Sequence, residues 1–142
     1  MNSIELQIIT AERVVFSDIV EAVVAPGIEG ELGILPHHSA LMTNLKAGAL
    51  MIRKDGEESF FVVTGGFLEV MDNRVTILSD AAEYSQEIDE ARAQLAMERA
   101  SERLANREDD LDLERALGQL KRAQIRVAVA RRKQSRRANR GL

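Results

Sequence analysis

The pattern of the sequence changes once, near Ser85, and this change restricts the possible folds more than any other feature. Before it, short runs rich in Val and Ile alternate with turn residues, which is typical of β-strands. After it, Ala, Arg, Glu, Gln and Leu dominate and Pro is absent. Charge divides at the same place: residues 1–84 hold 5 Lys and Arg against 13 Asp and Glu, and residues 85–142 hold 14 against 10. We therefore predict an α+β protein with two domains, 1–84 and 85–142.

The first domain is predicted to contain only β-strands. No segment of it has the length and periodicity of a βαβ crossover, so we expect antiparallel strands in a β-sandwich or flattened barrel. The turn signals are Pro26-Gly27, Asp55-Gly56, Gly65-Gly66 and Asp72-Asn73, and Asp55-Gly56 is typical of a tight hairpin. The expected strands cover residues 4–8, 13–16, 19–25, 50–52, 60–63, 67–71 and 75–78.

The second domain is predicted to be an antiparallel two-helix hairpin, with helices over about 87–105 and about 112–134 and the acidic stretch 106–110 between them. Its apolar faces are rich in Ala, which buries little area at roughly 25 cal/mol per Å². Gly118 weakens the second helix further, by about 1 kcal/mol relative to Ala. Such a hairpin is either a permanent pair or an element that a competing partner can open at small cost.

Several functional classes are disfavoured by composition and spacing. The absence of Cys excludes disulfides and thiolate metal sites, and neither a membrane-spanning run nor an export signal is recognisable. Gly27, Gly30 and Gly33 are spaced as in a phosphate loop, but no Lys-Ser/Thr follows, so we expect tight turns. His37 and His38 are adjacent and, on a strand, would point to opposite faces, so no metal site is expected. No hydroxyl residue has the context of a nucleophile, and an enzyme is not predicted.

Two basic features of the second domain remain open to interpretation. Asp89 and Arg92 lie three residues apart at a helix start, and Arg122 and Arg126 lie four apart on one helix face. These arginines could clamp a polyphosphate, or Asp89 and Arg92 could form an ordinary surface ion pair. The basic tail consists of Arg131, Arg132, Lys133, Arg136, Arg137 and Arg140. It is compatible with a nucleic acid, an acidic protein surface or a solvated end, although no aromatic residue is available for base stacking.

A known family accounts for these features together. The sequence PGIEGELGILPHH at residues 26–38, followed by LMTNLKAG at 41–48, resembles the signature of the epsilon subunit of bacterial-type F-type ATP synthases. The stretches GGFLEV at 65–70 and NRVTIL at 73–78 continue the resemblance, which covers essentially the whole chain. It implies a flattened β-sandwich followed by a helical hairpin.

The resemblance also implies partners. In this family the sandwich binds the gamma subunit and the ring of c subunits in the rotating central stalk. The helices can extend to the alpha and beta subunits of the catalytic head and restrain ATP hydrolysis, and the basic tail faces an acidic segment of beta. Neither catalysis nor nucleic acid is implied, and the membrane, at its cytoplasmic face or in a thylakoid, is contacted only through the complex. The implied partner-binding residues are Gly30, Gly33, Leu35, His37, His38 and Leu41.

The resemblance finally implies a regulatory ligand. Members that bind ATP carry an Ile/Leu-Asp-x-x-Arg-Ala motif in the folded hairpin, and Ile88, Asp89, Arg92 and Ala93 match it. Arg122 and Arg126 match the arginines of the second helix, and Glu83 falls where an acidic residue often precedes the site. No cofactor is required on this interpretation, and MgATP is expected as a regulatory ligand. A stand-alone ATP-sensing module without a rotary partner is the alternative.

Overall fold

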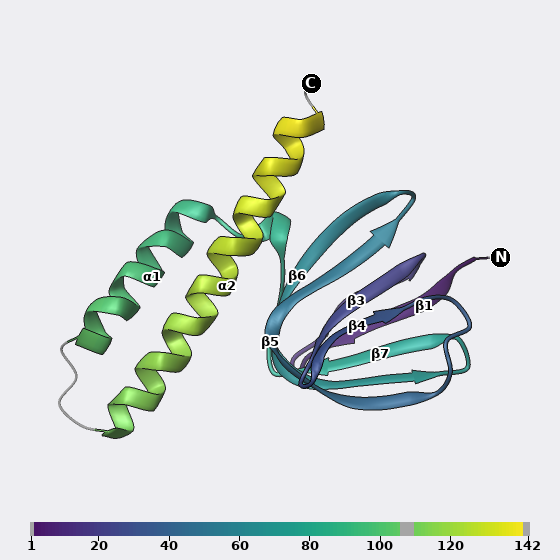
Figure 1. Cartoon of the computed structure of the whole chain (residues 1–142), viewed down its shortest axis with the longest axis horizontal. Coiled ribbons are helices and arrows are strands. Elements are labelled where there is room, and N and C mark those ends of the chain that lie inside the picture. The colour runs from purple at the N-terminus through teal and green to yellow at the C-terminus, as the bar shows by residue number, and fades with distance from the viewer. Residues whose placement is uncertain (1, 106–109, 141–142) are drawn as a thin grey trace. The chain divides into compact units, whose positions relative to one another are not determined.

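The computed structural model describes residues 2–105 and 110–140. The chain divides after Tyr84 into two compact units, a unit of β-strands followed by a unit of helices (Figure 1). Each unit is built from the elements that its residue pattern favours, because Val, Ile and Phe suit a half-buried pleated surface and Ala, Leu, Arg and Glu suit helices.

The first unit is one eight-stranded sheet in which the strands follow the order β2-β1-β7-β6-β5-β3-β4, with β8 paired to β6. The sheet is open, because β2 and β4 at its two ends are not paired with each other. It nevertheless encloses one core, since buried side chains of β1 and β7 cluster with those of β3, β5 and β6. The strands are β1 (Ile4–Ile9), β2 (Val14–Val20), β3 (Ala22–Gly27), β4 (Gly30–Ile34), β5 (Leu41–Lys54), β6 (Glu57–Met71), β7 (Arg74–Ser79) and β8 (Ala82–Tyr84).

The sheet folds into a sandwich along the long hairpin of β5 and β6, and Gly65-Gly66 lies at the fold. Residues 66–71 of β6 pair with β7, whereas residues 61–63 pair with β8. Both glycines have positive φ, +110° and +128°. A Cβ at Gly66 would lie 1.9 Å from the carbonyl oxygen of Leu78, so only glycine permits this approach of β7. The expected turn at Gly65-Gly66 is therefore wrong, because these residues continue β6.

Other predicted strands also need correction. Residues 30–34 and 41–49 are strands that were not predicted, and the expected strand over 19–25 is interrupted at Glu21. The expectation of antiparallel pairing fails at one place, because β1 and β7 are parallel. Turn residues in the sequence do not indicate the β1–β7 pairing, because most of the domain separates these two strands in the sequence. The tight hairpins at Asp55-Gly56 and Asp72-Asn73 are confirmed, and all four residues have positive φ.

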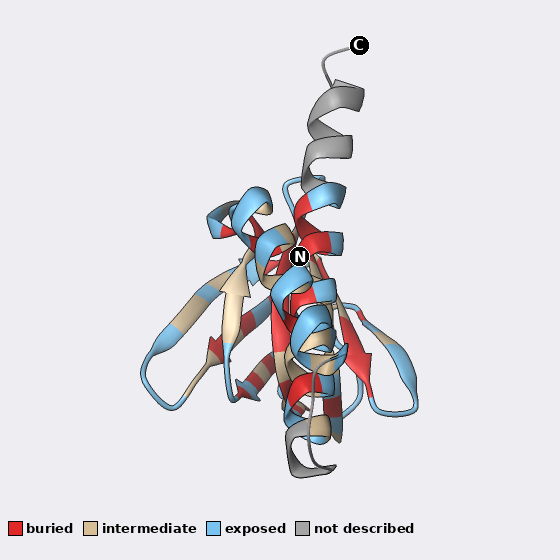
Figure 2. Cartoon of the chain, turned by 90° about the vertical axis from the view of Figure 1, so that its left-hand side faces the viewer, coloured by how far each residue is buried: buried red, intermediate tan, exposed pale blue. Residues whose placement is uncertain are grey.

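The second unit is the predicted helical hairpin. A short 3₁₀ turn, η1 (Ser85–Glu87), precedes α1 (Glu90–Ala105) and α2 (Asp110–Arg140). The first helix therefore begins later, and the second is longer, than the sequence pattern predicts. Small side chains dominate the buried face that runs along both helices, where Figure 2 shows the buried residues in red. They are Ala93, Ala100, Ala116, Ala123, Val127 and Ala130.

Candidate functional site

The motif at residues 88–93 forms the N-terminus of α1. The Asp89 side chain is the N-cap, because its Oδ1 accepts a hydrogen bond of 3.2 Å from the backbone N–H of Arg92. Its carbonyl oxygen accepts the first helical bond, 2.9 Å from the N–H of Ala93. Ile88 and Ala93 are buried, while the Arg92 side chain is 87% exposed. The motif therefore fixes a helix end and leaves one guanidinium at the surface.

Polar contacts between the two helices fix their register. On one flank, Arg103 donates a hydrogen bond of 3.2 Å to Oε1 of Gln119. On the opposite flank, Arg131 donates to Glu90, at 3.4 Å, and to Gln94, at 3.1 Å. Residue pairs whose numbers add to about 222 therefore face each other across the hairpin.

This register gathers arginines on the Arg103 flank. Along α1, Arg99 and Arg92 lie four and eleven residues before Arg103, on the same side of the helix. Along α2, the same side of the helix as Gln119 carries three arginines, which lie four residues before it, three after it and seven after it: Arg115, Arg122 and Arg126. Two carboxylates lie beside these arginines along α1: Asp89, three residues before Arg92, and Glu102, three residues after Arg99. We call this surface the arginine flank; it comprises Arg92, Arg99, Arg103, Arg115, Arg122 and Arg126.

The arginine flank is compact enough to bind a polyanion. The register places Arg126 about 6 Å, and Arg122 about 12 Å, from Arg92 along the hairpin axis. Arg99 faces Arg122 across the seam. The Arg122 guanidinium folds back over Gly118, where an added Cβ would lie 3.3 Å from its Nη1. Guanidiniums so arranged offer bidentate donors and fixed positive charge to phosphate groups.

The sequence interpretation found only part of this surface. Arg92, Arg122 and Arg126 were predicted, whereas Arg99, Arg103 and Arg115 were missed. Helical spacing from the predicted arginines would have found them once the register was known. Glu83 lies on β8 in the first unit, opposite Val62, and its assignment to a nucleotide site stays a prediction.

The basic tail is described only in part. The side chains of Arg131 and Arg132 are exposed, and Arg131 bridges Glu90 and Gln94. The side chains of Lys133, Arg136 and Arg137 lie outside the described residues, so their predicted inhibitory role stays a prediction.

In the first unit, the predicted partner-binding residues fall into different settings. Leu35, His37 and His38 lie together in residues 35–40, which connect β4 to β5 and which we call the connecting loop. Leu35 is 62% exposed, and His37 has a φ of +65°. Gly30 and Gly33 are exposed on β4, whereas Leu41 packs against the core.

The structure corrects the expected geometry of the two histidines. They occupy a turn rather than a strand, with the N–H of His38 donating to the carbonyl of Leu35 at 3.2 Å. The backbone N–H of His37 donates to Oδ1 of Asn73 at 2.8 Å. Across the described part of the chain, no group of three or more His, Asp or Glu side chains is placed to hold a metal ion.

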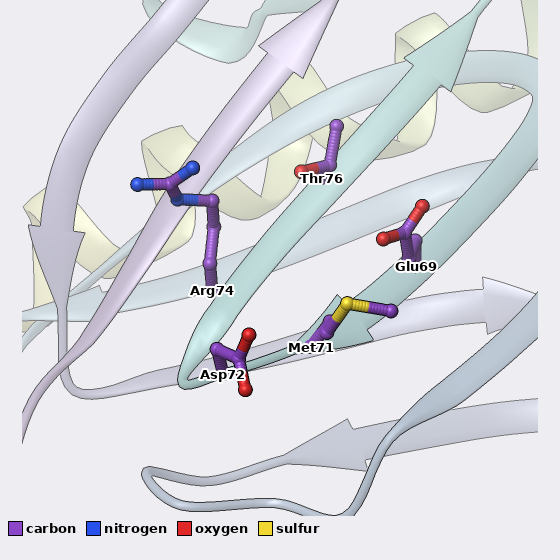
Figure 3. A pocket seen from close by; sticks show the side chains of 5 residues that line it. All are labelled: Glu69, Met71, Asp72, Arg74 and Thr76. Carbon is purple, nitrogen blue, oxygen red and sulfur yellow. The ribbon is translucent and has the colours of Figure 1, made fainter.

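Large apolar side chains are exposed on the half of the sheet formed by β5, β6 and β7. Met42 is 70%, Phe67 55% and Leu78 50% exposed, and Phe67 and Leu78 are neighbours in register. Beside them lies a pocket of about 310 Å³ at the β6–β7 turn, which Figure 3 shows with its lining residues Glu69, Met71, Asp72, Arg74 and Thr76. Sequence reasoning did not identify this surface.

The ionic contacts of the first unit are at its surface. Lys54 donates to Oδ2 of Asp18, which lowers the pKa of Asp18 and raises that of Lys54. Arg74 on β7 pairs with Glu5 on β1 at 3.1 Å. The Arg74–Glu5 pair joins neighbouring strands, whereas the Lys54–Asp18 pair joins β5 to β2, which are not neighbours in the sheet. Neither pair resembles a catalytic arrangement.

Both units match known protein families. Residues 3–85 match the model of the ATP synthase delta/epsilon chain β-sandwich domain, and residues 86–131 match its long α-helix domain. The chain belongs to the ATP synthase delta/epsilon chain family. The "ATP synthase epsilon chain" of Herpetosiphon aurantiacus is 47% identical over 94% of this chain and 98% of its own length. That of Pelotomaculum thermopropionicum is 54% identical over 72% of this chain and 76% of its own length.

A solved structure supports the same family. A chain in the cryo-EM structure "Euglena gracilis mitochondrial ATP synthase, OSCP/F1/c-ring in rotational state 1" matches with a TM-score of 0.73 and 26% identity. The match covers 83% of this chain and 75% of that one. Within residues 2–105 and 110–140, no helix is long and apolar enough to span a membrane.

Proposed function

We propose that this chain is the epsilon subunit of an F-type ATP synthase, a non-catalytic component of the central stalk. The observation that carries the proposal is the match of both units, in order, to the two domains of one family, together with relatives named epsilon chain that align over nearly their whole length. The subunit would join the membrane only through the complex, at the cytoplasmic face of a bacterial membrane.

The β-sandwich would bind the gamma subunit and the c-ring. The exposed side chains of Met42, Phe67 and Leu78 support this assignment, because contiguous apolar surface on a soluble domain is typical of a protein contact. The connecting loop adds the exposed Leu35 and two imidazoles. We assign the exposed apolar surface of β5, β6 and β7 to the gamma subunit and the connecting loop to the c-ring.

The helical hairpin would regulate ATP hydrolysis. Its seam is made mainly of alanines, whose burial contributes little, so opening the hairpin costs little free energy. An opened hairpin presents α2 and its basic end to the alpha and beta subunits of the catalytic head, where it inhibits hydrolysis. A few kcal/mol between closed and open states is enough for a ligand to decide which is populated.

ATP would be that ligand, bound as MgATP on the arginine flank. Arg92, Arg122 and Arg126 would hold the phosphates, with Asp89 keeping Arg92 at the helix end. A ligand that binds only the closed hairpin stabilises it by about 2.7 kcal/mol at a hundredfold excess over Kd. High ATP therefore favours the closed, non-inhibiting form.

The test compares MgATP hydrolysis by the reconstituted catalytic head and gamma with either the full-length chain or a chain lacking residues 86–142. We expect both forms to bind gamma and only the full-length chain to inhibit hydrolysis. Loss of gamma binding on deletion would contradict this division of roles. A stand-alone ATP sensor would instead bind ATP and ignore gamma in either form.

A further inference from the structure

Asn73, in the turn between β6 and β7, connects segments that lie far apart in the sequence. Its Oδ1 accepts a hydrogen bond of 2.8 Å from the backbone N–H of His37. Its Nδ2 donates a bond of 2.9 Å to the carbonyl oxygen of Ser3, and its own carbonyl accepts one of 3.2 Å from the N–H of Glu5. One residue thus joins the connecting loop, the N-terminal segment and the β6–β7 turn.

The chemistry of this position favours asparagine. The φ of Asn73 is +58°, a region that Asn tolerates better than most residues other than Gly. The side chain must also accept one hydrogen bond and donate another, which an amide does and a carboxylate cannot do when ionised. Glycine would preserve the backbone but neither side-chain bond, and aspartate would preserve only the acceptor.

The connecting loop depends on this residue. Within the loop, the bonds of His38 to Leu35 and Ser39 are local and do not anchor it to the sheet. Among the described residues, the bond between His37 and Asn73 is the one hydrogen bond that links residues 35–40 to another segment. Without it, the loop would be restrained only at its two ends and by its own turn.

We propose that Asn73 is a positioning residue for the partner contact of the connecting loop. It holds His37, and through the His38 turn Leu35, in one geometry before binding. A pre-ordered loop loses less conformational entropy when it binds, so affinity is higher than for a loose loop. The inference rests on the proposed function, in which this loop meets the c-ring.

The test uses the full-length chain with Asn73→Gly, which keeps the positive φ and removes both side-chain bonds. Asn73→Asp is the conservative variant, since it retains the acceptor for His37. Asp55→Gly is the matched control, because Asp55 has a φ of +53° in the hairpin turn at the other end of β5 and β6. Two quantities are measured: hydrogen exchange of the His37 amide by NMR, and the affinity for the cognate, detergent-solubilised c-ring carrying gamma.

We expect Asn73→Gly to accelerate His37 exchange about tenfold and to weaken rotor binding about five- to tenfold, the range for losing one or two hydrogen bonds. Asn73→Asp should restore both quantities to within about threefold of wild type, and Asp55→Gly should change neither. Unchanged exchange in Asn73→Gly, or faster exchange with unchanged affinity, would overturn the proposal.

Two further outcomes are separated by the design. If Asn73→Gly unfolds, as circular dichroism would show, both measurements are repeated in an osmolyte such as trimethylamine N-oxide, which stabilises folded chains. If the wild-type chain itself fails to bind the rotor, the proposed function fails before any substitution is made, and the positioning role fails with it. A defect confined to Asn73→Gly and repaired by Asn73→Asp supports the proposal.

Discussion

At the scale of single residues, the same side chains serve structure and function. Asp89 was predicted as part of a nucleotide motif, and the structure gives it a local role as the N-cap of α1. The sequence placed Asp89 near a helix start but did not predict the cap, because the helix was expected from about residue 87 and begins at Glu90. The role of Asn73 could not be predicted, since its partners at Ser3 and His37 come from distant segments.

The capping role of Asp89 predicts a specific stability change. Asp89→Ala removes the acceptor for the N–H of Arg92 and should lower the free energy of unfolding of the helical unit by about 1 kcal/mol. Asp89→Ser, which can still cap, should be close to wild type. Urea unfolding followed by circular dichroism checks this, and equal stabilities of the Ala and Ser variants would contradict the capping role.

The Asp18–Lys54 pair predicts a pH dependence. Because Lys54 lowers the pKa of Asp18, the stabilisation is present above the ordinary Asp value of 3.8 and is lost as pH falls through the lower folded value. Because Asp18 raises the pKa of Lys54, the stabilisation is present below 10.5 and is lost as pH rises through the higher folded value. An NMR titration should show the Asp18 midpoint returning toward 3.8 in Lys54→Met; an unchanged midpoint would exclude the pair in solution.

At the scale of elements, local residue patterns predicted whether a segment is a helix or a strand better than they predicted how long it is. The two helices and the tight hairpins follow from propensity and turn chemistry, which act over a few residues. The Gly65-Gly66 pair was misread because glycines that mark a turn and glycines that admit a neighbouring strand are alike in a sequence. The distinction depends on Leu78, whose carbonyl oxygen meets Gly66.

This close approach predicts that Gly66→Ala is severely destabilising. The new Cβ would lie 1.9 Å from a backbone oxygen at a φ of +128°, so β6 and β7 must separate. We expect a loss of about 3 kcal/mol or more, as for other strained backbone substitutions. Gly33→Ala is the control, because nothing lies within 4 Å of its Cβ. Similar melting temperatures for the two variants would refute the explanation.

The arginine flank makes a prediction at the same scale. Arg122→Ala and Arg126→Ala should each weaken MgATP binding about tenfold or more, since each removes a charged donor to phosphate. Lys121→Ala removes an exposed positive charge from another face of α2 and should have little effect. Calorimetric titration of the full-length chain measures all three; if Lys121→Ala weakens binding as much as the arginine variants, net charge rather than the flank is responsible.

At the scale of the whole molecule, the sequence predicted two parts and their fold classes, because each part has its own periodicity. It did not predict the parallel β1–β7 pair or the surface formed by β5, β6 and β7, since both require the order of strands in the sheet. Only half of the arginine flank was predicted, for the same reason. Which arginines belong to it depends on the register between α1 and α2, which is seen in the contacts of Arg103 with Gln119 and of Arg131 with Glu90.

The position of β1 inside the sheet has a consequence for how the protein is made. Of the strands in this sheet, β1 is synthesised first, yet on one side it pairs with β7, which only β8 follows. Contacts between such distant segments slow folding. The nascent chain therefore leaves the apolar strand with Leu6 and Ile8 unpaired on that side until Ser79 has been made, and this strand is where a chaperone would be expected to bind.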